Sequence, residues 1–225
     1  MNVTECKNLI IAAHPDDETI GCSSVLRDSV VFMFTNPDSN RMKIFDEICN
    51  DLNILTIKFD LEPLKLDTYG THYLLNLLEN AYTHISKNSQ SICGKPQNRV
   101  HITNVFGHYS GDLHQDHQAL ARATDIFCRR RTKDFKAYYQ YFTDNTFPTE
   151  NIILNPAPDK YELLNRYHHK DVVTHNSNNQ MINHNPKGIQ SEHHKYILNF
   201  SEMLKQRYQM VCVPDAFICK YRIGL

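Results

Sequence analysis

Short apolar runs alternate with helix-like patterns from residue 8 to residue 142, and this alternation constrains the fold of the chain more than any other feature. We expect strands at residues 8–13, 30–35, 56–59, 99–105 and 135–142, separated by helices at residues 19–27, 41–53, 71–86 and 117–129. Strands that alternate with helices form a mostly parallel sheet, because each crossover helix carries the chain back to the same edge. The sequence therefore predicts an α/β fold in which a mostly parallel sheet is flanked by helices.

The last third of the chain carries a weaker pattern. Residues 143–190 are rich in Asn, Pro and His with only short apolar islands, which indicates a long loop, a lid or irregular elements. Residues 191–209 follow helical spacing, and residues 210–221 are expected to hold one or two terminal strands. Because 225 residues fit one domain and no linker marks a boundary, we predict a single domain over residues 1–225, with a variable, substrate-selecting region at about 143–190.

Charge and hydropathy exclude several classes of protein. The 24 Lys and Arg residues nearly balance the 25 Asp and Glu residues, so no net field recruits nucleic acid. The short basic run at residues 129–133 is typical of a solvated helix end. No stretch approaches the roughly 18 apolar residues of a membrane span. The first residues lack a secretion signal, so we expect a cytoplasmic protein.

The seven cysteines carry little functional signal. They are scattered along the chain without any C-x-x-C pair, and their number is odd. Disulfide frameworks belong mainly to small secreted domains, so we expect reduced thiols rather than disulfides or zinc ligands.

Two short motifs lie where predicted strands end. Residues 13–18 read Ala-His-Pro-Asp-Asp-Glu directly after the first strand, and residues 114–117 read His-Gln-Asp-His shortly after the fourth. The carboxyl ends of parallel strands meet at one edge of a sheet, where ligands collect. One histidine and three carboxylates after a buried strand must be hydrogen-bonded, neutralised or bound to a metal, because buried unpaired charge is costly.

A divalent cation satisfies these groups. His14 and Asp17 are three residues apart and can point to one side as the chain turns into a helix, and His117 completes a three-ligand face. Two imidazoles, one carboxylate and an open position suit a catalytic zinc, although iron(II) accepts the same ligands. Asp16 is then placed to take a proton from the reacting water as a general base.

The second motif adds two candidates. His114, three positions before His117, is expected near the metal, where it stabilises an oxyanion and protonates a leaving amine. Asp116 is predicted to orient one of the two imidazoles. Each motif alone has a simpler interpretation, since Asp-Asp after a strand often caps a helix and His-x-x-His is often incidental. Their occurrence together at two strand ends favours metal-assisted hydrolysis.

These motifs resemble the signature of the LmbE-like, or PIG-L, family of zinc-dependent N-acetylglucosaminyl de-N-acetylases. That signature is Ala-His-Pro-Asp-Asp-Glu near the amino terminus and a later His-x-Asp-His. The resemblance implies a Rossmann-like single domain with zinc ligands at His14, Asp17 and His117. It also implies a base at Asp16 and an acid or oxyanion partner at His114, which agrees with the assignment from spacing.

The resemblance extends beyond the two motifs but is incomplete. Arg41 matches an Arg that opens the helix after the second strand, where it either grips a substrate hydroxyl or phosphate or is simply a surface residue. Ile44 stands where the family has Glu, and Asn53 stands where it has Gly. Residues 214–217, Pro-Asp-Ala-Phe, resemble an Ala-Glu-Ala-Phe stretch with two changes.

Other polar residues are further candidates for substrate contact. Asn36 and Asp38, on the loop after the second strand, face the expected cleft and either contact a sugar or form a turn. Tyr109 and Asp112 precede the second motif and lie close to it in sequence. The paired histidines in the second half do not favour a second metal site, because adjacent side chains point in different directions.

The leading interpretation is an enzyme that hydrolyses an N-acetyl group from a small-molecule amino sugar or its conjugate, with no nucleic-acid partner. Hydrolysis of another amide on the same metal site, such as a thiol conjugate, is one alternative. A non-catalytic sugar-binding protein on this scaffold is a second. The sequence leaves the amino sugar, the physiological metal and the oligomeric state open.

Overall fold

The computed structural model describes residues 5–36, 39–87, 99–143, 148, 151–169, 173–175, 181–183 and 199–222. Its main element is a seven-stranded sheet in the order β3-β2-β1-β4-β5-β9-β6. The strands are β1 (Glu5–Ala12), β2 (Ser29–Thr35), β3 (Leu55–Leu61), β4 (Arg99–His108), β5 (Ala137–Tyr141), β6 (Ile153–Pro156) and β9 (Pro214–Arg222). The first five are parallel and β9 is antiparallel to both of its neighbours, which confirms a Rossmann-like α/β fold.

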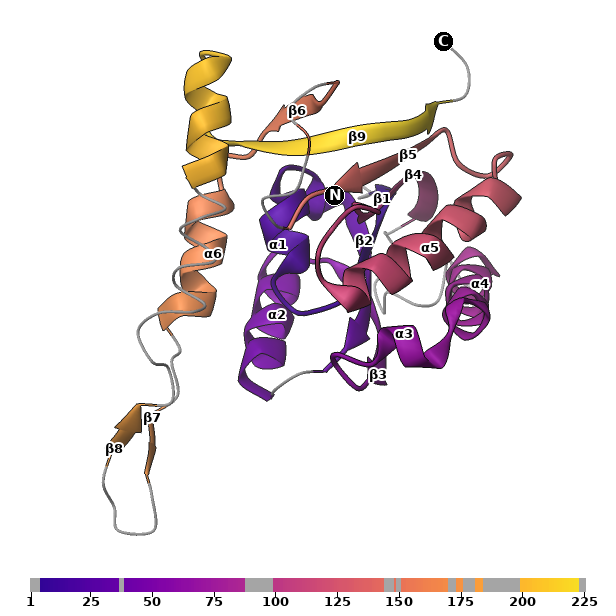
Figure 1. The fold of residues 1–225 in the computed structure, drawn as a ribbon, viewed down its shortest axis with the longest axis horizontal. Helices are drawn as coiled ribbons and strands as arrows, with labels where there is room; N and C mark the ends of the chain where they lie inside the picture. Colours follow the sequence, from indigo (N-terminus) through magenta and orange to yellow (C-terminus); the bar gives the residue numbers. More distant parts are fainter. Residues whose placement is uncertain are drawn as a thin grey trace.

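Helices cover both faces of this sheet. Figure 1 shows α1 and α2 on one side and α3, α4 and α5 on the other. The helices are α1 (Asp17–Cys22), the 3-10 helix η1 (Ser23–Asp28), α2 (Ser39–Asp51), α3 (Leu66–Tyr69), α4 (Thr71–Lys87), α5 (Gln115–Arg130) and α6 (Lys160–His169). Residues 199–207 are also helical. A separate antiparallel pair consists of β7 (Val173–His175) and β8 (Met181–Asn183).

Central strands read as continuous apolar runs because both of their faces are buried. Leu9 and Ile11 of β1 pack in the cluster formed with α3, α4 and α5, whereas Ile10 and Ala12 pack in the cluster formed with α2, η1 and α6. All four residues are fully buried. Strands covered on two faces lose the alternation of polar and apolar residues, and this explains the pattern from which the sheet was predicted.

The structure corrects several predicted boundaries. The helix predicted at residues 19–27 is α1 followed by η1, and the four-residue α3 was not predicted. β4 continues to His108, beyond the predicted end at residue 105. Gly107 interrupts the apolar run, but a Cβ there would lie 2.9 Å from Thr124 Cγ2, so the glycine permits the close approach of α5.

The region at 143–190 is more regular than the sequence indicates. It contains β6, which pairs with β9, and α6, which packs against α1, α2 and η1. These elements are short and take their partners from distant parts of the chain, so local patterns do not reveal them. The predicted terminal strands are one strand, β9, and the described part of the helix predicted at 191–209 is residues 199–207.

Asn53 follows α2 with a φ of 56°, a left-handed conformation that Asn tolerates better than most residues, so it can stand in place of a helix-ending glycine.

No helix in the described ranges is both long and apolar enough to cross a membrane.

Candidate metal centre

The two sequence motifs meet at the point where the strand order reverses. From β1 the chain moves outward through β2 to β3, and it then returns to the other side of β1 with β4. Loops that follow the strands on either side of such a point form a crevice, which is where open α/β sheets bind ligands. Residues 13–18 follow β1, and residues 109–117 lead from β4 into α5.

Three side chains direct one ligand atom each to a common point. His14 Nδ1 lies 3.1 Å from His117 Nε2, and Asp17 Oδ2 lies 3.3 Å from each of these nitrogens. Two ligand atoms bound tetrahedrally to one zinc ion at 2.0–2.1 Å are roughly 3.3 Å apart. The predicted ligand set therefore has the spacing that a shared cation requires, and the donors fit a divalent metal such as zinc.

Each imidazole is anchored by a carboxylate at its other nitrogen. His14 Nε2 donates to Asp116 Oδ2 at 3.0 Å, and His117 Nδ1 donates to Asp112 Oδ2 at 2.9 Å. Thr143 Oγ1 donates to the same Asp112 oxygen at 2.7 Å. A carboxylate behind a histidine fixes its tautomer and leaves the facing nitrogen with a lone pair for metal. Asp116, predicted to orient one of the two imidazoles, makes its contact with His14.

Electrostatics favour a positive charge in the cluster. Burial opposes charge on His117, but Asp17 and Asp112 outweigh it and raise the pKa of His117 to about 10. Burial also opposes charge on His14, whose contacts with Asp116 and Asp17 raise its pKa. Burial raises the pKa of Asp17, yet His117 holds it well below its usual value. The carboxylates that favour a proton on each imidazole also favour a cation at the same point.

Asp16, the predicted general base, lies beside this cluster in a strained backbone conformation. Its φ is 116°, and its carboxylate is ion-paired with Arg41. Its backbone N–H donates to Glu18 Oε2 at 3.1 Å, and Tyr167 of α6 donates to Glu18 Oε1 at 2.8 Å. Burial raises the pKa of Glu18 to about 7. Strain of this kind persists only where neighbouring contacts hold it, and here Glu18 supplies them.

His114 lies close to the cluster, and its ring forms with those of His14 and His117 a group of three imidazoles whose ligand nitrogens lie within 4.8 Å of one another, near enough to share a metal ion. Its ring lies 4.7 Å from that of His14, and its Nδ1 accepts the backbone N–H of Asp116 at 3.2 Å, which caps α5. Burial and the charge of His117 lower the pKa of His114. A neutral ring whose Nδ1 accepts a hydrogen bond carries its proton on Nε2. In that form His114 is suited to donate a hydrogen bond from Nε2, and its role as the acid that protonates the leaving amine stays a prediction.

His108 is the functional candidate that the sequence analysis missed. It is fully buried at the end of β4, its ring stacks on His117 at 4.0 Å, and its Nε2 lies 3.5 Å from Asp17 Oδ2. The N–H of Ala13 donates to that Nε2 at 3.0 Å, which occupies its lone pair. Within the described parts of the chain, His108 Nδ1 is buried without a hydrogen-bond partner. The sequence would have indicated His108 only if the strand had been predicted to end at residue 108 instead of residue 105.

A cavity of about 340 Å³ opens onto the cluster. This volume falls in the range of small-molecule sites. Its lining consists of His14, Asp16, Asp17, Ile20, Arg41, Pro63, Leu64, His114 and His117. The cavity therefore brings together the predicted ligands, base, His114 and Arg41.

Other predicted contacts do not line this cavity. Asn36 is exposed and donates to Asp60 Oδ1 at 2.8 Å, so its contact is with β3. Asp38 lies outside the described residues. Tyr109 packs in the cluster that contains α6, and Asp112 is buried behind His117 instead of facing substrate. Arg41 does line the cavity, where burial would lower its pKa but Asp16 raises it.

Six cysteines are described, all of them as free thiols: Cys6, Cys22, Cys49, Cys128, Cys212 and Cys219. Cys93 and the side chains of the paired histidines lie outside the described residues.

Comparisons with known proteins concern the fold. No protein-family model matches the sequence, and no curated protein matches it either. The chain is similar to the conserved protein TT1542 from Thermus thermophilus, with a TM-score of 0.62 and 15% identity over 98% of this chain and 97% of that one. At this identity, the similarity shows a shared fold alone.

A second solved structure is a triple mutant of a deacetylase involved in the teicoplanin biosynthetic pathway. It is 13% identical, with 77% of this chain and 86% of that one covered and a TM-score of 0.48. At this score the similarity supports no statement about the activity of the present chain.

Proposed function

We propose that the chain is a zinc-dependent amidohydrolase that removes an N-acetyl group from an amino sugar or amino-sugar conjugate. The observation that carries the proposal is the convergence of His14 Nδ1, Asp17 Oδ2 and His117 Nε2 at 3.1–3.3 Å beside a cavity. The acetyl group and the amino sugar rest on the resemblance of the two motifs to the LmbE-like family. A cytoplasmic location and a small-molecule substrate belong to the same proposal.

A cation held by these three residues supplies Lewis-acid chemistry, which polarises a carbonyl oxygen and makes water more acidic. The protein supplies the proton transfers. Asp16 accepts a proton from the attacking water and returns it to the amine nitrogen as the C–N bond breaks, and its pairing with Arg41 fixes the carboxylate at the cavity wall. His114 Nε2–H donates a hydrogen bond to the oxygen that becomes negative. Asp112 and Asp116 keep the imidazoles aligned behind the site.

Acetate release tests the proposal. The zinc-loaded protein is assayed with N-acetylglucosamine conjugates and, in parallel, with thiol-conjugate amides and simple acetamides. Faster acetate release from the amino-sugar conjugates supports the proposal. Faster release from another amide favours the first alternative, in which the same metal site hydrolyses that amide. Full zinc occupancy without turnover of any amide contradicts hydrolysis and favours the non-catalytic sugar-binding alternative.

A further inference from the structure

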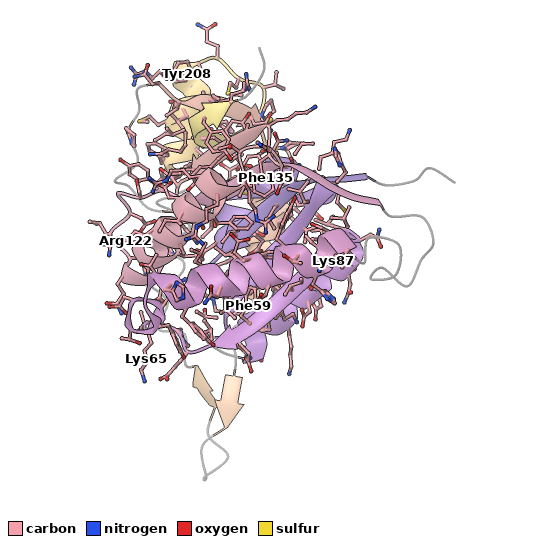
Figure 2. All side chains as sticks on the ribbon, turned by 90° about the vertical axis from the view of Figure 1, so that its right-hand side faces the viewer. Phe59, Lys65, Lys87, Arg122, Phe135 and Tyr208 are labelled. Carbon is pink, nitrogen blue, oxygen red and sulfur yellow. The ribbon has the colours of Figure 1, made fainter. Side chains whose placement is uncertain are left out.

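The loop between β3 and α3 is fastened to the candidate metal centre. Asp116 Oδ2 accepts the backbone N–H of Leu64 at 2.6 Å, and Asp116 Oδ1 accepts that of Leu66 at 2.9 Å. The same carboxylate anchors His14, so one side chain fixes both a candidate ligand and this loop. Lys65, between the two leucines, lies at the outer corner of the molecule beneath α4 (Figure 2). The loop is therefore a fixed wall of the cavity.

Leu64 occupies this wall at a cost in free energy, for two independent reasons. Its φ is 61°, a left-handed conformation that side chains with a Cβ adopt at a cost. Its side chain is also 61% exposed, although a leucine gains most from burial. Backbone strain of this kind is concentrated at functional sites. A substrate that covers the side chain would account for both features.

The cavity lining contains two kinds of side chain. Charge and hydrogen bonds come from the three candidate metal ligands and, in addition, from Asp16, Arg41 and His114. The apolar part of the lining consists of Ile20, Pro63 and Leu64. The methyl group of an acetyl substituent is a single carbon, which is too small to cover an exposed leucine and its proline neighbour. The cavity of about 340 Å³ has room for a larger apolar group beside the scissile amide.

We propose that Leu64, with Pro63 and Ile20, binds an apolar group of the substrate, either a longer N-acyl chain or an alkyl or aryl group on the amine side. This inference rests on the proposed function and deepens it, because it assigns the substrate to amphipathic amides. Leu64 is then a specificity-determining residue whose strained backbone presents its side chain to the substrate.

The variant that isolates this role is Leu64→Asn. Asn tolerates a left-handed backbone, so the change relieves strain while it removes the apolar surface. The melting temperature is expected to stay the same or rise, whereas a merely structural leucine would lower it on replacement. Leu113→Asn is the matched control, since Leu113 is 72% exposed next to His114 but does not line the cavity.

Two substrate series separate the possible positions of the apolar group. One extends the N-acyl chain of glucosamine from acetyl to butanoyl and hexanoyl, and the other extends the glycoside of N-acetylglucosamine from methyl to octyl. A buried methylene is worth about fourfold in kcat/KM. We expect the zinc-loaded wild-type protein to prefer the longer member of one series at least tenfold. Leu64→Asn should lose most of this preference, and Leu113→Asn should keep it.

Equal kcat/KM along both series, or an unchanged preference in Leu64→Asn, overturns the inference. If no amide is hydrolysed, the proposed function fails and binding decides the inference separately. The shortest and longest members of both series are then compared by calorimetry on the wild-type protein and both variants. Tighter binding of the longer compound of either series that is lost only in Leu64→Asn supports the apolar wall, and equal binding along both series contradicts it.

Discussion

Two clusters of buried charge in the described part of the chain differ in what they face. In the closed cluster, Lys160 Nζ of α6 lies 3.0 Å from Asp215 Oδ1 of β9, and both side chains are fully buried. Asp215 also accepts from Ser23 Oγ and the backbone N–H of Ser24, and Lys160 contacts Ser201 Oγ at 3.4 Å. Every charge in this cluster is compensated by the chain itself.

The open cluster of His14, Asp17 and His117 is arranged differently. Its outer nitrogens are anchored to Asp116 and Asp112, but its inner atoms converge on one another at the wall of a cavity. Burial of charge alone therefore does not mark a functional site. The open cluster is distinguished by ligand atoms that converge beside a cavity, a geometry that offers a site to a cation.

The largest expected effect concerns the base in the open cluster. Asp16→Asn keeps the size of the side chain and suits the left-handed backbone, but it cannot accept a proton. Turnover should fall by about 10²–10⁴-fold, the usual contribution of general base catalysis, while zinc content stays at the wild-type level. Steady-state rates measure the turnover, and elemental analysis of the same sample measures the zinc content. Substantial residual turnover with zinc retained removes Asp16 from this role.

Mutation of the closed cluster should change the stability of the fold instead of turnover. Lys160→Met leaves the charge of Asp215 buried without its partner and should destabilise the fold by about 3–5 kcal/mol. Urea unfolding measures the loss, and the zinc bound per folded molecule should not change. The matched double variant Lys160→Met with Asp215→Leu should recover most of the stability. A reduced zinc stoichiometry in Lys160→Met would show that the two clusters are not independent.

Replacing a carboxylate that anchors the open cluster should have an intermediate effect, on zinc affinity. Asp112→Asn keeps the shape of the side chain but weakens the hold on His117 Nδ1. Zinc affinity should fall by about 10–100-fold, as for other carboxylates behind metal-bound histidines. Competition with a chromophoric chelator measures the affinity. The control is Asp60→Asn, which alters an exposed carboxylate that binds Asn36 outside the cavity. Equal affinities in the two variants contradict the anchoring role.

The smallest effect is a pH dependence of the protein after chelation of its metal. Because the folded-state pKa of His117 is raised to about 10, its protonation stabilises the fold fully below its ordinary pKa of about 6.5 and less as the pH rises toward 10. Stability should decline over that window by at most about 1.4 kcal/mol per pH unit. Urea midpoints between pH 7 and pH 10 measure it. An equal slope in His117→Gln assigns the dependence to other groups.

Sequence patterns predicted the fold and the open cluster because both depend on local signals. The two-sided burial of β1 and β2 produces continuous apolar runs, and the polar motifs directly follow strand ends. Parallel strands bring their carboxyl ends together, so the meeting of His14 and His117 followed from topology. The sequence also placed Asp116 behind one of the two imidazoles, and only the structure shows that this imidazole is His14.

What the sequence did not reveal depends on contacts between distant residues. The pair Lys160–Asp215 joins positions 55 apart, and the role of Asp112 depends on Thr143 and His117 from separate elements. His108 was missed because Gly107 breaks the apolar pattern of β4 for a packing reason that only the position of α5 explains. The positive φ of Leu64 has no local sequence signal either.

The central claim is that one cation is shared by His14 Nδ1, Asp17 Oδ2 and His117 Nε2. Anomalous scattering at the zinc edge, recorded from crystals of the zinc-loaded protein, tests it directly. The account predicts a single strong peak about 2.0–2.2 Å from each of these three atoms. A peak bound instead by His108, or no peak at this position in a zinc-saturated crystal, would contradict it.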